Sequence, residues 1–124
     1  MLFTYQAKVD PRSEYTMGAY DEDTIDLVFD LGFSLRICKR VRLVTVNTPE
    51  LRGVGRVQGI HFRDLARQWL KEAMSQDSNV EFPLIVVTSK ADSFGRYLAD
   101  VKRLGDEQSL SDYFIERGAP IYKR

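Results

Sequence analysis

Three short segments of this 124-residue chain concentrate side chains that suit metal ions and phosphate. Residues 21–24 read Asp-Glu-Asp-Thr, residues 42–50 begin with Arg42 and end in Asn-Thr-Pro-Glu, and residues 92–96 read Asp-Ser-Phe-Gly-Arg. Hard divalent cations prefer oxygen ligands, and the planar guanidinium of arginine pairs with phosphate oxygens. Taken singly, each segment also has an ordinary structural explanation: a solvated acidic turn, a strand arginine in a surface ion pair, or a hairpin turn with a charged exit.

The elements that must position these segments are mainly β-strands. Alternating and β-favouring residues predict strands over residues 3–9, 15–20, 24–30, 34–46, 80–88 and 96–103. We expect the acidic residues 21–23 to form a turn between two of these strands. Pro49 cannot donate to a strand ladder, so the chain should leave the sheet after residue 46, and Pro83 indicates an edge or a bulge.

The sequence pattern also predicts two helices. Apolar residues recur at helical spacing within residues 60–75, and we interpret them as a core-facing stripe. The members of this stripe are Phe62, Leu65, Ala66, Trp69, Leu70 and Ala73. A shorter helix is expected over residues 109–117, with Ser109 as its N-cap and Gly118 in the C-terminal capping position.

The order of these elements indicates the fold class. Strands first, then an inserted helix, a strand pair and a closing helix point to an α+β fold with a small barrel. Five strands with an interposed helix suit an oligonucleotide/oligosaccharide-binding (OB) barrel. The length fits one domain over residues 1–124.

Composition limits the classes of partner and site. The 18 basic residues cancel the 18 acidic ones, so attraction to phosphate must come from local placement of arginine and lysine. Cys38 is the only cysteine, which excludes a disulfide framework and a cysteine metal site. The first ten residues resemble neither a signal peptide nor a membrane span, so we expect a cytoplasmic protein without a membrane partner.

In type, order and spacing, the three segments together resemble the staphylococcal nuclease family. That family carries Asp-Gly-Asp-Thr, then Arg-Leu and Asp-Thr-Pro-Glu, then Asp-x-Tyr-Gly-Arg followed by a Leu-Ala strand. The similarity extends over roughly Tyr5 to Tyr122 and includes the family's last helix. Residues 30–33 ahead of Arg-Val-Arg-Leu look like a subgroup common in bacteriophage and bacterial genomes, which suggests a phage-encoded protein acting in the host cytoplasm.

The resemblance implies a five-stranded OB-fold-like barrel with three helices and a phosphodiesterase site that depends on calcium or another divalent cation. Asp23 matches a metal ligand, and Thr48 matches a residue that ligates metal through its backbone carbonyl. Glu50 matches the glutamate that positions or deprotonates the attacking water. Arg42 and Arg96 match the two arginines that bind the scissile phosphate.

Further positions receive supporting roles. By the same resemblance, Asp21 and Asp92 match carboxylates that support the site without ligating the metal. Residues 51–58 contain two glycines and are expected to form a mobile loop beside the site. Such a loop would carry Arg52 and Arg56 to the substrate backbone, and a solvated loop without contacts is the alternative.

Three positions depart from the family pattern. Asn47 stands where the family usually has its second metal-ligating Asp, and its neutral amide oxygen still suits calcium although one negative charge is lost. Glu22 replaces the glycine of the acidic turn. Phe94 replaces a tyrosine near the bound nucleotide and keeps the ring without its hydroxyl, so it stays a substrate-binding candidate.

These departures leave two functions open. The first is a metal-dependent nuclease that hydrolyses phosphodiester bonds of DNA, RNA or both. The second is a weakened or inactive nuclease-like domain that binds nucleic acid or a protein partner without cutting. Retention of Glu50 and both arginines favours the nuclease, because a purely structural barrel has little reason to keep these three groups together.

We predict that Asn47→Asp tightens calcium binding on the order of tenfold, because ligand charge sets much of the affinity of calcium sites. Isothermal titration calorimetry of the altered and unaltered chains with Ca²⁺ measures this change. Asn47→Ala, which removes the side-chain oxygen, is the matched control and should bind more weakly than either. Equal affinities in all three proteins would show that residue 47 does not face the metal.

Overall fold

Six β-strands, two α-helices and one 3-10 turn make up the part of the chain that the computed structural model describes, namely residues 3–13, 18–21, 24–43, 56–76, 79–91 and 97–118. The strands are β1 (Phe3–Val9), β2 (Ala19–Asp21), β3 (Thr24–Asp30), β4 (Arg36–Leu43), β5 (Leu84–Ala91) and β6 (Tyr97–Arg103). The helices are α1 (Arg56–Ser75) and α2 (Leu110–Glu116), and the 3-10 turn is η1 (Pro11–Ser13).

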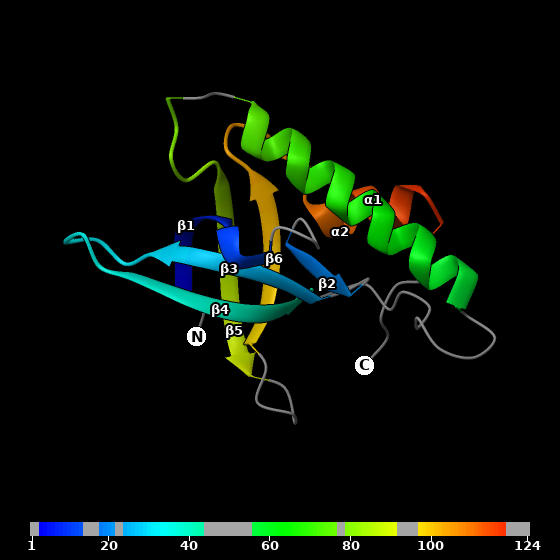
Figure 1. Ribbon diagram of the computed structural model, residues 1–124, viewed down its shortest axis with the longest axis horizontal. Helices are drawn as coiled ribbons and strands as arrows, with labels where there is room; N and C mark the ends of the chain where they lie inside the picture. Colours follow the sequence, from blue (N-terminus) through cyan, green and yellow to red (C-terminus); the bar gives the residue numbers. More distant parts are fainter. Residues whose placement is uncertain are drawn as a thin grey trace.

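Five of the strands close into a barrel (Figure 1). The strands are ordered β1-β5-β6-β4-β3-β2 in the sheet. Because β1 also pairs with β3, the five strands β1, β5, β6, β4 and β3 form a closed ring, and β2 pairs with β3 at its edge. All neighbours are antiparallel except β4 and β6, which are parallel. This arrangement confirms the predicted α+β fold with an OB-like barrel.

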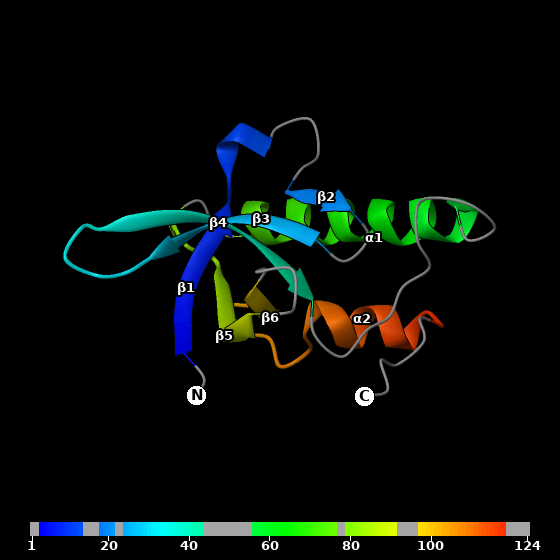
Figure 2. The same cartoon turned by 90° about the horizontal axis from the view of Figure 1, so that it is seen from below.

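Helix α1 packs on the barrel through the apolar stripe that the sequence predicts. Phe62, Ala66, Trp69, Leu70 and Ala73 are buried in the common core, and Leu65 packs against it. The Phe62 ring meets Phe114 of α2 edge-on, with the ring centroids 5.4 Å apart. Figures 1 and 2 show both helices on one side of the molecule, while the β3–β4 hairpin projects from the opposite side.

Arg103, the last residue of β6, contacts α1 through Trp69 and Glu72. Its guanidinium carbon lies 4.6 Å from the centroid of the Trp69 ring, and Nη2 donates a 3.0 Å hydrogen bond to the Trp69 carbonyl. The same nitrogen lies 3.2 Å from the Glu72 carboxylate. Stacking, a backbone hydrogen bond and an ion pair therefore all act at one helix–strand contact.

The structure corrects several predicted strand boundaries. β2 covers Ala19–Asp21 instead of residues 15–20, and β5 ends at Ala91 instead of residue 88. β5 begins at Leu84 instead of residue 80, because Pro83 has no N–H to donate, and the Pro83 carbonyl accepts a hydrogen bond from the Leu104 N–H at 2.8 Å. β4 begins at Arg36 instead of residue 34, because Phe33 and Ser34 form the hairpin turn with positive φ angles of 54° and 62°.

The helix predictions also need correction. α1 begins at Arg56 instead of residue 60, so the last part of the expected 51–58 loop is helical, and residues 51–55 lie outside the described residues. Gly59 lies within this helix, at a cost of roughly 1 kcal/mol relative to alanine. The extra turn carried no capping signal in the sequence.

The described residues form two α-helices, whereas the resemblance implied three. α2 ends with Arg117 as its C-cap, and Gly118 has a φ of 93°, a left-handed conformation that glycine adopts without a Cβ penalty and that stops the helix. At its start, the Ser109 hydroxyl accepts from the Asp112 N–H at 3.0 Å, which confirms the predicted N-cap. Neither helix is long and apolar enough to cross a membrane, as far as the described chain extends.

Asp10 lies directly after β1, and its hydrogen bonds stabilise the 3-10 turn η1 that follows. Asp10 is 6% exposed, and its carboxylate accepts hydrogen bonds from the Arg12 backbone N–H at 3.0 Å and from the Arg12 guanidinium at 2.8 Å. Hydrogen bonding from the Arg12 side chain holds the pKa of Asp10 below its ordinary value of 3.8. The folded protein therefore stabilises the ionised form of the Asp10 carboxylate relative to the protonated form.

We predict that Asp10→Asn lowers the free energy of unfolding at pH 7 by about 1–2 kcal/mol, because it removes charge-assisted hydrogen bonds. The folded pKa lies below the unfolded one, so the contribution of Asp10 is complete above roughly pH 4 and is lost as the pH falls through the folded pKa. Urea unfolding at pH 7 and pH 3 should therefore show a difference between the two proteins that shrinks at pH 3.

Glu107→Gln, at an exposed acidic position, is the control for this comparison. It should change the free energy of unfolding by less than about 0.5 kcal/mol at pH 7. A difference between Asp10→Asn and the unaltered chain that stays constant from pH 7 to pH 3 would contradict the assigned role of the Asp10 charge.

Candidate functional site

One row of paired residues across the sheet links the three segments that the sequence predicts to form a site. Asp21 pairs with Thr24, Thr24 pairs with Arg42, and Arg42 pairs with Leu98. Asp21 is the last residue of β2 and Thr24 is the first of β3, so the acidic turn joins this row directly. Leu98 follows Arg96 by two positions in the chain.

The parallel pairing of β4 and β6 occurs at the strand ends that border the other two segments. It joins residues 41–43 to residues 97–99. β4 ends at Leu43, four residues before Asn47 of the Asn-Thr-Pro-Glu segment, and β6 begins at Tyr97, directly after the Asp-Ser-Phe-Gly-Arg segment. The fold therefore brings the borders of all three predicted segments to one end of neighbouring strands.

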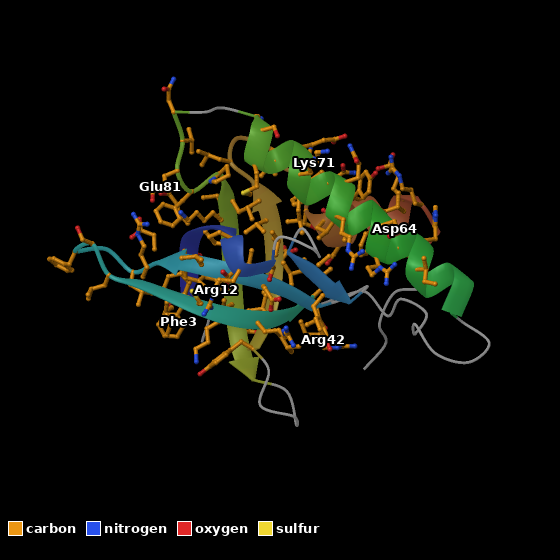
Figure 3. The ribbon with its side chains drawn as sticks, in the orientation of Figure 1. Phe3, Arg12, Arg42, Asp64, Lys71 and Glu81 are labelled. Carbon is orange, nitrogen blue, oxygen red and sulfur yellow. The ribbon has the colours of Figure 1, made fainter. Side chains whose placement is uncertain are left out.

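Arg42 is the predicted site residue whose side chain the structure describes. It is half-buried and its strand partner Thr24 is 4% exposed, so the sheet holds this position firmly. Figure 3 shows Arg42 near the end of β4. Its guanidinium can pair with an anion that approaches this end of the barrel.

Two further arginines of β4, Arg36 and Arg40, pair with carboxylates. Arg40 Nε lies 2.7 Å from Asp26 Oδ1, and the Arg40 guanidinium also stacks on the Tyr20 ring at 3.9 Å from its centroid. Hydrogen bonding to Asp26 raises the pKa of Arg40 above its ordinary value. Arg36 pairs with Glu81 at 2.6 Å. These two arginines therefore have structural roles in the barrel wall.

The remaining predicted site residues are not tested by the structure. Those outside the described residues are Asp23, Asn47, Thr48, Glu50, Arg52, Asp92, Phe94 and Arg96. Asp21 and Arg56 are described through their backbone only, at the end of β2 and at the start of α1. Within the described part of the chain, no three His, Cys, Asp or Glu side chains gather into a metal site. The metal ligands and the water-activating glutamate stay predictions.

A groove that the sequence analysis did not predict opens at one mouth of the barrel. We call it the barrel-mouth groove, and it has a volume of about 570 Å³. Its lining includes Phe3, Tyr5, Ile37, Lys39, Val41 and Tyr97. The alternation of β4 contained a signal for it, because the inward face that buries Leu43 and Val41 continues to Lys39 and Ile37, which are exposed.

Comparison with protein families gives a match over most of the chain. Residues 40–124 match the family described as staphylococcal nuclease homologue. No curated protein matches the chain. The matched range covers more than half of the chain and includes the end of β4, two of the three predicted segments and α2. Because this match covers more than half of the chain, and the closed five-stranded barrel fits it, the chain belongs to the staphylococcal nuclease family.

Proposed function

We propose that the chain is a metal-dependent nuclease that hydrolyses phosphodiester bonds of DNA, RNA or both. The row from Asp21 through Thr24 and Arg42 to Leu98 is the observation that supports this proposal most strongly. It joins the strands that border an acidic turn, a glutamate-bearing segment and a second arginine. Membership of a nuclease family supports the same reaction class.

In this proposal, Arg42 and Arg96 bind the scissile phosphate from neighbouring strands. β4 carries Arg42, and β6 begins one residue after Arg96. Two guanidinium groups can each form paired hydrogen bonds with the non-bridging oxygens. Negative charge grows on these oxygens as the reaction proceeds, so the arginines would stabilise the transition state more than the bound substrate.

Glu50 is the proposed acceptor for the proton of the attacking water. As the water oxygen bonds to phosphorus, the bond from phosphorus to the leaving sugar oxygen breaks. One proton of the water passes to the Glu50 carboxylate, and the departing sugar oxygen takes a proton from solvent. A positioned carboxylate of this kind contributes about 10²- to 10⁴-fold to the rate. Glu50 lies seven residues after the end of β4, which is close enough along the chain for this role.

The donor set proposed for the metal fits calcium by its chemistry. Asp23 offers a carboxylate, Asn47 an amide oxygen and Thr48 a backbone carbonyl, and all three are the hard oxygen ligands that Ca²⁺ accepts. A bound divalent cation would polarise the phosphate and orient the nucleophile. Because Asn47 is neutral, other divalent cations are proposed to compete at this position.

A second candidate function is nucleic-acid or protein binding without cleavage. The observation that favours it is Asn47, since the loss of one carboxylate weakens the proposed metal site. The two candidate functions differ in whether the chain cleaves the nucleic acid that it binds, and cleavage can be measured directly.

We expect the purified chain to degrade single-stranded DNA or RNA when calcium is added and to stop when a chelator is added. Gel analysis of labelled oligonucleotides with calcium, magnesium and manganese in parallel tests this expectation. Glu50→Gln prepared in the same way is the control for contaminating nucleases and should be about 10²- to 10⁴-fold slower while still binding substrate. Intact substrate under all three metals would exclude the nuclease and leave the binding function.

We further expect Arg42→Lys to lower kcat by about 10²- to 10³-fold, because lysine keeps the charge but loses the planar pair of donors. Arg40→Lys is the matched control, two residues away on the same strand and engaged with Asp26. It should keep nearly full activity. Equal losses of activity in the two variants would indicate a general effect on β4 and would remove Arg42 from phosphate binding.

A further inference from the structure

The inner face of the barrel continues along the β3–β4 hairpin, which projects beyond the barrel (Figures 1 and 2). Phe29 pairs with Ile37, so these two side chains share one face of the hairpin. Leu31 and Leu35 extend this face, because the Leu31 N–H donates to the Leu35 carbonyl at 2.9 Å and each lies two positions from a paired residue. Phe29 is buried, whereas the other three side chains are exposed. The hairpin therefore presents an exposed apolar face that leads into the barrel-mouth groove.

The tip of the hairpin is a hydrogen-bonded turn that presents one aromatic ring. Gly32, Phe33 and Ser34 have successive positive φ angles of 78°, 54° and 62°, which is uncommon for the two residues that are not glycine. The Asp30 carboxylate accepts from the Gly32 N–H at 2.9 Å, and the Leu35 N–H donates to the Gly32 carbonyl at 2.9 Å. Phe33 is 99% exposed, so this turn holds a phenyl ring almost entirely in solvent.

The barrel-mouth groove is suited to receive a ring of this kind. Its volume is about 570 Å³, and an apolar cavity of about 150 Å³ is already large enough for benzene. Its walls are mainly aromatic and aliphatic, and they include Phe3, Tyr5 and Val41. The rings of Tyr5 and Phe29 meet edge-on with their centroids 5.7 Å apart, an arrangement that a further ring can extend. One chain therefore carries both a protruding ring and an apolar recess.

The spacing of ring and groove permits two copies of the chain to exchange them. Phe33 lies four positions from Ile37 at the groove, a separation on the order of 10 Å along the hairpin. A twofold axis between them would place each Phe33 ring over the groove of the other copy. The exposed Leu35, which lies between them in the chain, would then contact its counterpart near the axis. Such a contact uses the same patch on both chains and closes at two subunits.

The exposed apolar area is sufficient for a stable dimer. Five apolar side chains of the hairpin and the groove are between 39% and 99% exposed, namely Phe3, Leu31, Phe33, Leu35 and Ile37. With about 200 Å² for a whole aromatic side chain and somewhat less for an aliphatic one, they expose roughly 500 Å² together. Homodimer interfaces are about 65% apolar, so the corresponding interface would bury roughly 800 Å² on each chain, the standard size for a specific complex.

The charges around the hairpin favour a second copy over a lipid surface. Two acidic and two basic side chains belong to residues 30–39 and to the carboxylate partner of Arg36: they are Asp30, Glu81, Arg36 and Lys39. An anionic membrane is bound through an excess of lysine and arginine, which this balance does not provide. Lys39 lines the groove and Asp30 lies at the turn, so an exchange between copies also brings opposite charges closer together.

We infer that two copies of the chain associate as a twofold dimer in which each inserts Phe33 into the barrel-mouth groove of the other. Figure 3 shows the labelled Phe3 and Arg42 toward opposite ends of β4, and Arg42 lies on the opposite face of this strand from Val41. Dimer formation therefore leaves the proposed phosphate site of each chain open and is independent of the proposed function.

Sedimentation velocity over a range of chain concentrations measures the dissociation constant of the dimer. The unaltered chain should shift from 14.3 kDa toward twice this mass as its concentration rises. Phe33→Ala should raise the dissociation constant at least about 30-fold, because central aromatic residues of interfaces contribute this much and the dimer loses two of them. Thermal unfolding of the dilute chains checks that the variant keeps the fold, as the exposure of Phe33 leads us to expect.

Leu104→Ala is the matched control, because this leucine is an exposed apolar side chain outside the hairpin and does not line the groove. It should dimerise like the unaltered chain. An equal loss of association in Leu104→Ala and Phe33→Ala would indicate unspecific hydrophobic association and would contradict the proposed contact.

A mixing experiment tests the exchange of ring and groove directly. Ile37→Glu places a charge in the groove and keeps the tip, whereas Phe33→Ala keeps the groove and loses the ring; Ile37→Thr replaces Ile37→Glu if the latter does not fold. Each variant alone lacks both contacts, but a mixed dimer keeps one ring in one intact groove. With one chain labelled for fluorescence, the mixture should therefore associate at least about 30-fold more tightly than either variant alone.

Four results would overturn the inference. The first is a mass that stays at 14.3 kDa up to millimolar concentration. The second is a dimer whose dissociation constant Phe33→Ala leaves unchanged, which would lie on another surface. The third is a mass that grows beyond the dimer, which would indicate an open head-to-tail contact. The fourth is a monomer that binds vesicles of equal parts phosphatidylcholine and phosphatidylserine and loses this binding in Phe33→Ala, which would assign the tip to a lipid surface.

Discussion

The parallel contact between β4 and β6 joins two parts of the chain that are far apart in sequence, residues 41–43 and 97–99. Val41, Leu43 and Ala99 are buried behind it, so displacing one strand would expose the centre of the barrel. Because side chains alternate along a strand, a shift of one residue would turn Arg42 from the outer face to the inner one. The arrangement of the site therefore depends on this short contact and on the apolar packing that holds its register.

The helices stabilise the barrel on the side opposite the β3–β4 hairpin. α1 buries its apolar stripe, α2 closes the core with Phe114, and Arg103 connects Trp69 of α1 to β6. β2, whose last residue Asp21 belongs to the row with Arg42, contacts α1 directly, because Arg67 donates a 3.2 Å hydrogen bond to the Ala19 carbonyl. Phe3 and Tyr97 can stay exposed at the barrel mouth, where a sealed core would have enclosed them.

Local patterns predicted a large part of the fold. The bounds of β1 and β3 agree with residues 3–9 and 24–30, and the stripe on α1 is buried as its spacing indicated. Ser109 and Gly118 have the predicted capping roles because capping depends on residues three or four positions apart. The start of β4 could not be predicted, because Phe33 and Ser34 adopt left-handed backbone angles that the sequence does not favour and the hairpin imposes. The extra turn of α1 carried no clear local signal, whereas the local pattern predicted the two helices that the described residues form.

By itself, the sequence determined the chemical groups available to the site: Arg42 on a strand, Glu50 after a proline, Arg96 before a strand, and an asparagine at position 47. These groups can be identified from the sequence because the residue type defines the side-chain chemistry and the position in the chain defines the local spacing. Only the tertiary structure decided that β4 lies beside β6, that Asp21, Thr24 and Arg42 form one row, and that Lys39 and Tyr97 share a groove with Phe3. These relations come from long-range strand pairing, which is selected by closure of the barrel and burial of its core and not by any short stretch of sequence.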